Sequence, residues 1–136
     1  MHTCMKEKQL VATAGTLVVA CHVTDNSGAC SSRSETWKPP KNGWVKINVD
    51  AAYSFQDGKS HMGCIARDLY GKVLWASSTE TGRSMNAEEA EAKACLVALQ
   101  QIPKPENLLV ELESDNATVV DAIKNRNQKL SALWRF

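Results

Sequence analysis

The sequence has no excess of one charge, no paired cysteine motif and no long hydrophobic run. Its 136 residues contain 16 Lys and Arg against 15 Asp and Glu, which gives a net charge of +1. Domains that bind nucleic acids are usually more basic than this. The balance does not exclude such a partner, because acids gathered at one site lower the net charge without removing basic groups elsewhere.

The cysteines and histidines exclude two kinds of small protein. The five cysteines are an odd number and include no C-x-x-C pair, which argues against a disulfide framework and against a zinc ribbon. Cys64 and Cys95 fall in apolar segments and are expected to be buried thiols in a reducing compartment. The three histidines have no spacing that is typical of paired metal ligands.

The one apolar run near the N-terminus, Leu10 to Cys21, is too short to cross a membrane and is interrupted by Thr and Gly. It resembles a short secretory segment, but the free cysteines argue against secretion, and a poorly ordered leader or a loose helix is the favoured interpretation. Residues 22–36 are rich in Ser, Thr, Asn and Gly and are typical of a linker. We therefore expect residues 1–36 to be a poorly ordered leader and linker, and residues 37–136 to form one domain.

The domain contains clear strand and helix patterns. Apolar residues alternate along Trp44–Asp50, and Met62–Arg67 and Val73–Ser77 predict a hairpin. Asn86 followed by Glu89 predicts a capping box for a helix that ends near Gln101, before Pro103. A further alternating strand covers Leu108–Asp115, and Ser114 or Asp115 is expected to cap a last helix through Ile123.

This order of elements, β-β-β-α-β-α, predicts an α/β fold with a mixed sheet. A strand–helix–strand crossover places the first and fourth of these strands in parallel. Ligands of such sheets bind at the carboxyl ends of the strands. Asp50 and Asp115 both lie where we expect a strand to end.

A third acid, Glu91, lies early in the predicted helix on one stripe with Cys95, Ala98 and Ile102. Each acid alone has an ordinary structural explanation, as a turn residue, a helix cap or an exposed helix acid. Together, three carboxylates that converge repel one another, and a divalent cation relieves that repulsion. Glu88 is a weaker candidate one turn earlier. The sequence thus predicts a metal site made by Asp50, Glu91 and Asp115.

Several short motifs resemble the ribonuclease H type 1 domain, and more narrowly its plant, retrotransposon-derived branch. They occur in the family's order and cover residues 37 to about 135: Trp37-x-Pro-Pro40, Gly43 to Ala52, Ala66-Arg-Asp-x-x-Gly71, Ala90-Glu-Ala-x-Ala94 and Glu113-Ser-Asp115 before Val119-Val120. The resemblance implies cleavage of the RNA strand of an RNA–DNA hybrid by a hydrolase, an endonuclease. It implies no small-molecule cofactor and no membrane, and we expect a monomer in the nucleus or cytoplasm.

The resemblance also assigns roles to the three acids. It implies two Mg²⁺ ions (Mn²⁺ being a possible substitute) about 4 Å apart, with Asp50 bridging both and Glu91 and Asp115 each holding one. One ion would activate the attacking water and the other would stabilise the leaving 3′ oxygen. Hybrid selectivity would come from contacts with the 2′-OH groups. Lys46, Arg67, Lys72 and Arg83 are candidates for phosphate contacts, and the sequence does not choose among them.

The sequence departs from the family after Asp115. The family continues into a fifth strand and a final helix, with a fourth metal-binding acid and a mobile His, for which we find no counterpart here. We expect the strand at 108–115 to expose an edge, and the loss of one acid to reduce activity by roughly 10- to 100-fold. The alternative function is therefore an inactive RNase H-like remnant that binds nucleic acid or a protein partner.

Overall fold

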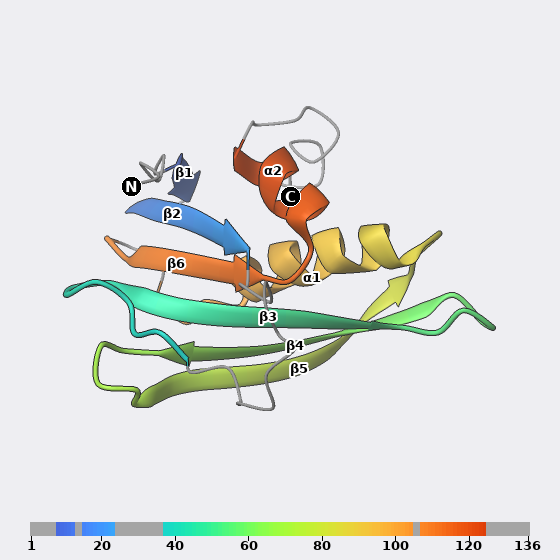
Figure 1. Ribbon diagram of the computed structural model, residues 1–136, viewed down its shortest axis with the longest axis horizontal. Helices are drawn as coiled ribbons and strands as arrows, with labels where there is room; N and C mark the ends of the chain where they lie inside the picture. Colours follow the sequence, from blue (N-terminus) through green and yellow to red (C-terminus); the bar gives the residue numbers. More distant parts are fainter. Residues whose placement is uncertain (1–7, 13–14, 24–36, 105–106, 125–136) are drawn as a thin grey trace, which may run out of the picture.

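The computed structural model describes residues 8–12, 15–23, 37–104 and 107–124 of the chain (Figure 1). Six strands form one sheet in the order β1-β2-β6-β3-β4-β5. The elements along the chain are β1 (Lys8–Ala12), β2 (Gly15–Val23), β3 (Val45–Tyr53), β4 (Lys59–Arg67), β5 (Val73–Arg83), α1 (Ala87–Gln100), β6 (Leu109–Ser114) and α2 (Ala117–Lys124). The predicted mixed α/β fold is confirmed, with the predicted element order from β3 to α2.

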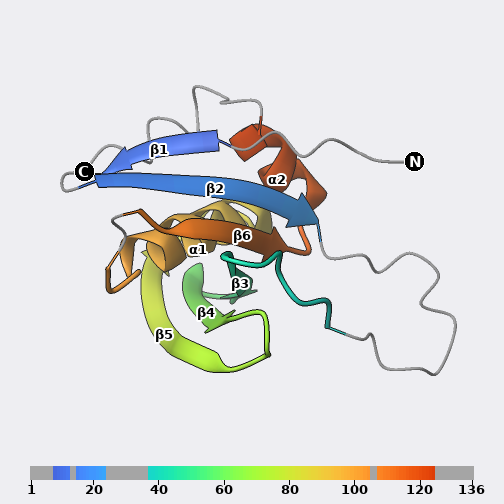
Figure 2. The ribbon, with the colours of Figure 1, turned by 90° about the vertical axis from the view of Figure 1, so that its left-hand side faces the viewer.

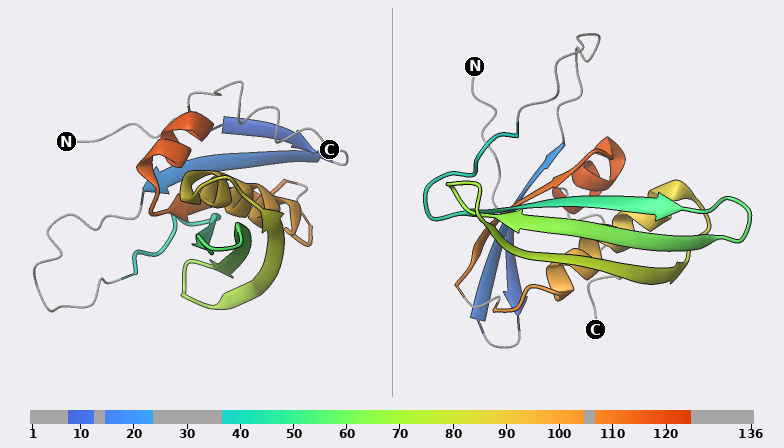
Figure 3. Two further views of the ribbon diagram at one scale, coloured as in Figure 1. Left: turned by 90° about the vertical axis from the view of Figure 1, so that its right-hand side faces the viewer. Right: turned by 90° about the horizontal axis from the view of Figure 1, so that it is seen from below.

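The meander β3-β4-β5 is antiparallel, and β6 returns beside β3 in parallel after the crossover through α1. Helix α1 covers one face of the sheet (Figure 3, where α1 lies behind β3 to β5 in the right panel), and buried residues alternate with less buried ones along β4. The core combines apolar residues of the strands with small residues of the helix. Ala90, Ala94 and Ala98 are fully buried, which allows α1 to lie close to Ile47, Met62 and Leu112.

The first helix begins as its sequence predicts. The Asn86 side chain accepts a hydrogen bond from the Glu89 N–H at 2.8 Å, which satisfies one of the free donors of the first turn. The Glu89 carboxylate accepts from the Met85 N–H rather than from Asn86 itself, so the reciprocal half of the capping box lies one residue earlier. Cys95, Ala98 and Ile102 are buried along the predicted stripe.

The second helix is capped by a residue that differs from the prediction. Asn116, not Ser114 or Asp115, is the cap, because its side chain accepts from the Val119 N–H at 3.0 Å and its carbonyl accepts from Val120. The Ser114 hydroxyl instead accepts from the Asn116 N–H at 3.3 Å. Asp115 is thereby released from a capping role and is exposed.

Within the described N-terminal residues, 8–12 and 15–23, the structure has strands where a poorly ordered leader was predicted. Residues 8–12 and 15–23 form an antiparallel pair, and β2 runs parallel to β6 from Val18–Leu109 to Val23–Ser114 (Figure 2). The expectation that the strand at 108–115 exposes an edge is therefore wrong, because β2 supplies its hydrogen-bond partners. The local pattern of Leu10–Cys21 could not reveal a partner about 90 residues away. The predicted linker covered residues 22–36; its first two residues belong to β2, and residues 24–36 lie outside the described residues.

The strand that carries Asp50 is longer than the sequence predicts, and this changes the position of Asp50 in the sheet. The strand that contains Asp50 was predicted to end there, whereas β3 continues to Tyr53 in pairing with β4. Its pairing with β6 stops earlier, at Asn48–Glu113. Asp50 therefore lies where β3 separates from β6 rather than at a free strand end. Neither helix of the described part of the chain has the length and apolarity that a membrane span requires.

Candidate metal centre

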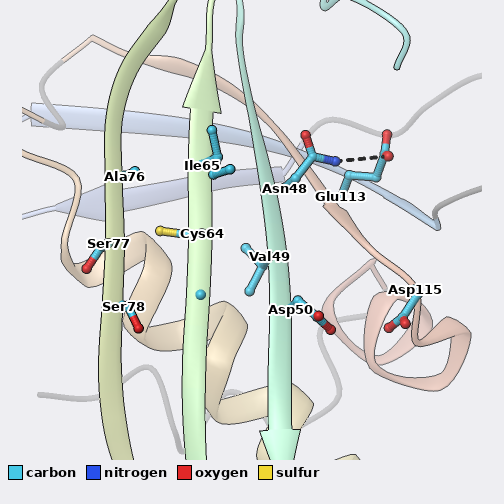
Figure 4. A pocket seen from close by; sticks show the side chains of 11 residues that line it. Asn48, Val49, Asp50, Cys64, Ile65, Ala76, Ser77, Ser78, Glu113 and Asp115 are labelled. Carbon is cyan, nitrogen blue, oxygen red and sulfur yellow. Dashed lines mark hydrogen bonds between the residues drawn. The ribbon is translucent and has the colours of Figure 1, made fainter. Parts of the chain in front are cut away.

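Asp50 and Asp115 reach the site from two strands that have just separated. Asp50 lies on β3 and Asp115 directly follows β6, and both side chains are exposed. In Figure 4 their carboxyl groups point toward one another. One oxygen of Asp50 accepts a hydrogen bond from the Ala51 N–H at 3.0 Å, which orients the carboxylate from its own backbone. The parallel pairing of β3 and β6 thus brings Asp50 and Asp115 together, as the sequence predicts.

Glu91 comes from the helix that crosses the sheet. It lies in the second turn of α1, between the buried Ala90 and Ala92, and is itself half-buried. Its Oε2 atom is buried and has no hydrogen-bond partner among the described residues. A buried carboxylate oxygen without a donor is costly to keep charged. This oxygen therefore needs either a proton or a cation.

The three acids form one group. Asp50, Glu91 and Asp115 each offer a carboxylate oxygen, and these oxygens lie within 4.8 Å of one another. Burial, followed by the charges of Asp115 and then Asp50, raises the pKa of Glu91 to about 7, and the nearby Ala51 N–H opposes this shift. Burial also raises the pKa of the Cys95 thiol below them, to about 12, so this cysteine is an inert core residue.

The group has the chemistry of a site for a hard divalent cation. Such ions prefer carboxylate oxygens, and a cation offsets the mutual repulsion that raises the pKa of Glu91. Within the described residues, no other group of three or more acids, histidines or cysteines comes close enough to hold an ion. The unpartnered Oε2 of Glu91 is the observation that a cation would explain.

A pocket of about 750 Å³ lies beside these acids, over the face of β3, β4 and β5 that is turned away from α1 (Figure 4). Gly63 faces Asp50 across the β3–β4 pair, and Ser78 faces Gly63 across the β4–β5 pair. A Cβ atom at Gly63 would meet no atom within 4 Å, so the space above this backbone is open. The floor is formed by Asn48, Val49, Asp50, Gly63, Cys64, Ile65, Ala76, Ser77, Ser78, Glu113 and Asp115.

The structure separates the other candidates that the sequence left together. Glu88 is exposed in the first turn of α1 and is not part of the acid group. Lys46 is only 4% exposed and pairs with Glu113 at 3.2 Å, so it is not available to a phosphate. The Arg67 guanidinium lies over the Trp37 ring, 5.4 Å from its centroid. Lys72 and Arg83 are exposed.

Asn48 and Glu113 fall within the motifs noted in the sequence but were not predicted as site residues, yet both line the pocket. Each stands two residues before one of the strand acids, Asp50 or Asp115, and the two form a register pair between β3 and β6. The period of two along a strand was the available signal, because residues i and i+2 share one face. The register between β3 and β6 could not be predicted, because the sequence does not encode it locally.

Comparison with known proteins places this architecture in a family. Residues 48–135 match the model of a family described as reverse transcriptase-like. The chain belongs to this reverse transcriptase-like family, and its domain is of the RNase H type. The matched segment contains the three acids. No curated protein matches the sequence.

Solved structures agree on the fold. LC11-RNase H1, isolated from compost by a metagenomic approach, is 19% identical with a TM-score of 0.56, over 67% of this chain and 73% of that protein. The same protein in complex with an RNA/DNA hybrid gives 20% identity and a TM-score of 0.55, over 65% and 72%. Identities this low establish a common fold. The reverse transcriptase-like domain thus shares the RNase H-type fold, and its sheet contains six strands.

Proposed function

We propose that this protein is a divalent-metal-dependent endoribonuclease that cleaves the RNA strand of RNA–DNA hybrids, with Mg²⁺, or Mn²⁺ in its place, held by Asp50, Glu91 and Asp115. The observation that carries the proposal is the convergence of these three carboxylates within 4.8 Å. Membership of the reverse transcriptase-like family and the fold shared with an RNase H1 that binds a hybrid support the same chemistry.

Each residue of the site has a part that follows from its position. Asp50 and Asp115 are exposed and can bind a cation from the solvent side, while Glu91 binds from the protein side with its unpartnered oxygen. A bound divalent cation supplies Lewis-acid polarisation of the phosphodiester and neutralises charge that develops on its oxygens. The carboxylates would hold the cation in place. The open backbone at Gly63 leaves room for a sugar–phosphate chain beside Asp50.

One cleavage assay tests the proposal. The purified chain is incubated with a labelled RNA–DNA hybrid and Mg²⁺ or Mn²⁺, beside Asp50→Asn, which keeps the shape of the side chain and removes its charge. Cleavage of the RNA strand by the wild type, reduced by about 100-fold or more in the variant, is expected. Equal cleavage rates for the wild type and Asp50→Asn would refute the proposed activity. Salt-sensitive hybrid binding without cleavage would then favour the inactive binding module.

Gly63→Val tests whether the pocket beside the acids is the substrate surface. The new side chain meets no protein atom near its Cβ, and Val suits a strand, so the fold is expected to persist. It would narrow the space over Asp50 and raise the KM for a hybrid by about tenfold or more, while Mn²⁺ affinity stays at the wild-type value. An unchanged KM would show that the substrate does not cross this face.

A further inference from the structure

The strands β3 and β6 separate immediately before the two strand acids. Their parallel pairing runs from Val45–Val110 to Asn48–Glu113, and no pair follows. Asp50 lies two residues further along β3 and therefore on the same face as Asn48. Asp115 lies two residues after Glu113, directly after the end of β6, and lines the same pocket. Asn48 and Glu113, the last paired residues of the two strands, thus lie beside the place where β3 and β6 separate and the two carboxylates follow.

A side-chain bridge closes this last pair. Asn48 donates from Nδ2 to Oε1 of Glu113 at 3.1 Å, which Figure 4 draws beside Asp50 and Asp115. The Asn48 Oδ1 atom accepts from the Trp37 indole N–H at 3.2 Å. Because one amide end accepts and the other donates, the orientation of the Asn48 side chain is fixed by its partners. We call Asn48 and Glu113, with their hydrogen bond, the strand bridge.

The strand bridge is held in turn by a buried charge. Lys46 Nζ lies 3.2 Å from Oε2 of Glu113 and donates to the Lys38 carbonyl at 2.7 Å. The positive charge of Lys46 offsets the negative charge of Glu113, so the network adds no net charge beside three acids that already repel one another. A satisfied polar network of this kind is rigid, because each member fixes the next.

We propose that Asn48 is a positioning residue: its bridge to Glu113 holds β3 and β6 together where they diverge, and so sets the separation of Asp50 and Asp115 that a divalent cation requires. This inference deepens the proposed function and rests on its metal site. Carboxylate repulsion drives Asp50 and Asp115 apart in the metal-free protein. Loss of the bridge removes a side-chain hydrogen bond between β3 and β6 that resists this repulsion.

A merely structural role for Asn48 makes a different prediction. Loss of one hydrogen-bonded residue would then lower stability but leave the cation affinity of the folded protein unchanged. The matched control is Asp68→Ala in the β4–β5 turn, where the Asp68 carboxylate accepts from the N–H groups of Tyr70 and Lys72 at 2.9 Å. This control removes polar contacts of a similar kind at a residue that belongs neither to the acid group nor to the strand bridge.

The test measures Mn²⁺ affinity by electron paramagnetic resonance, well below the unfolding temperature of each protein. Asn48→Leu, which keeps the approximate size but neither donates nor accepts, is expected to bind Mn²⁺ about 10- to 100-fold more weakly, and Asp68→Ala to bind like the wild type. Asn48→Ser, whose side chain is too short to span the gap to Glu113, replaces it if the Leu variant fails to fold. A wild-type affinity in either folded Asn48 variant overturns the proposal.

Crystal structures of the metal-free wild type and variant give a second readout that needs neither cation nor activity. The Asp50 and Asp115 carboxyl groups are expected to move apart in the variant, and a separation unchanged within about 0.5 Å overturns the inference. If Mn²⁺ binding depends on Asn48 but no hybrid is cleaved, the proposed enzymatic activity is wrong and the positioning role of Asn48 is supported. A wild type that binds no Mn²⁺ overturns both.

Discussion

The two strands that flank β6 both run parallel to it, yet they contact it with different chemistry. On the β3 side, a buried lysine pairs with Glu113 at 3.2 Å, and the strand carries Asp50 to the acid group. On the β2 side, His22 pairs with Glu111 at 3.2 Å, and Val19 and Cys21 enter the core. A lysine is charged at neutral pH, whereas a histidine is charged only when protonated.

This difference separates two tasks that one sheet performs. The β3–β6 contact places Asp50 and Asp115, two of the three proposed metal ligands, beside the Lys46–Glu113 ion pair. The β2–β6 contact covers an edge with backbone hydrogen bonds and apolar surface, and it carries none of the three acids. Changes on the β3 side should therefore alter both stability and metal binding, while changes on the β2 side should alter stability alone.

The largest effect is expected for Lys46→Met. The variant leaves the partly buried Glu113 carboxylate without its cation, and the free energy of unfolding should fall by about 3 kcal/mol. Urea denaturation measures this loss. Adding Glu113→Gln to Lys46→Met removes the unpaired charge and should recover part of the stability. A double variant no more stable than Lys46→Met would show that the charge pair is not the cause.

Two valine substitutions of equal size compare the flanks directly. Val19 on β2 is 1% exposed and Val49 on β3 is 5% exposed. Either change to Ala removes the same two methyl groups from the core and should lower stability by about 2 kcal/mol. Only Val49→Ala, whose residue adjoins Asp50, is expected also to weaken Mn²⁺ binding. Weaker Mn²⁺ binding in Val19→Ala would remove the distinction between the two sides.

The acids on the β3 side should also make metal binding depend on pH. Burial and the charges of Asp115 and Asp50 raise the pKa of Glu91 to about 7, so a proton competes with the cation below that pH. Mn²⁺ affinity should rise with pH by up to about tenfold per unit below pH 7 and level off above it. Calorimetric titrations from pH 5 to 8 measure this curve. In Asp115→Asn the midpoint should move to lower pH.

The raised pKa of Glu91 also determines how the stability of the metal-free protein changes with pH. Glu91 holds its proton more tightly in the folded than in the unfolded chain, whose carboxyl has the ordinary value of 4.5. Between these two pKa values the folded state binds more protons, so its stability falls as pH rises toward 7. The contribution is fully present below pH 4.5. A saturating divalent cation should remove this dependence, because the cation stabilises the charged form.

The parts of this molecule that sequence reasoning predicted are those that local patterns encode. The alternation before Asp50, the cap at Asn86 and the stripe of Glu91 and Cys95 each depend on neighbours within a few residues. The convergence of the acids followed from one topological rule, that a crossover makes its two strands parallel. Three local patterns and one rule were therefore enough to predict which acids meet.

The parts that were missed depend on pairing between distant segments. Nothing within Leu10–Cys21 indicates β6 as its partner, and the burial of Lys46 follows only from its register opposite Glu111 and its contact with Glu113. A one-residue shift in that register would turn the same side chains to the other face. The strand bridge was invisible for the same reason, although both of its residues stood two positions from a predicted site acid.

The smallest effect is expected for His22→Gln, on the β2 side. Glutamine can still donate a hydrogen bond to Glu111, whose second oxygen accepts from the Lys41 N–H at 2.7 Å. Glu111 is therefore not left unsatisfied, and the free energy of unfolding at pH 8 should change by less than about 1 kcal/mol. Urea denaturation at that pH, beside Lys46→Met, makes the comparison. A loss as large as that of the lysine variant would mean that both sides of β6 depend equally on their charge pairs, and the division of tasks between β2 and β3 would have to be abandoned.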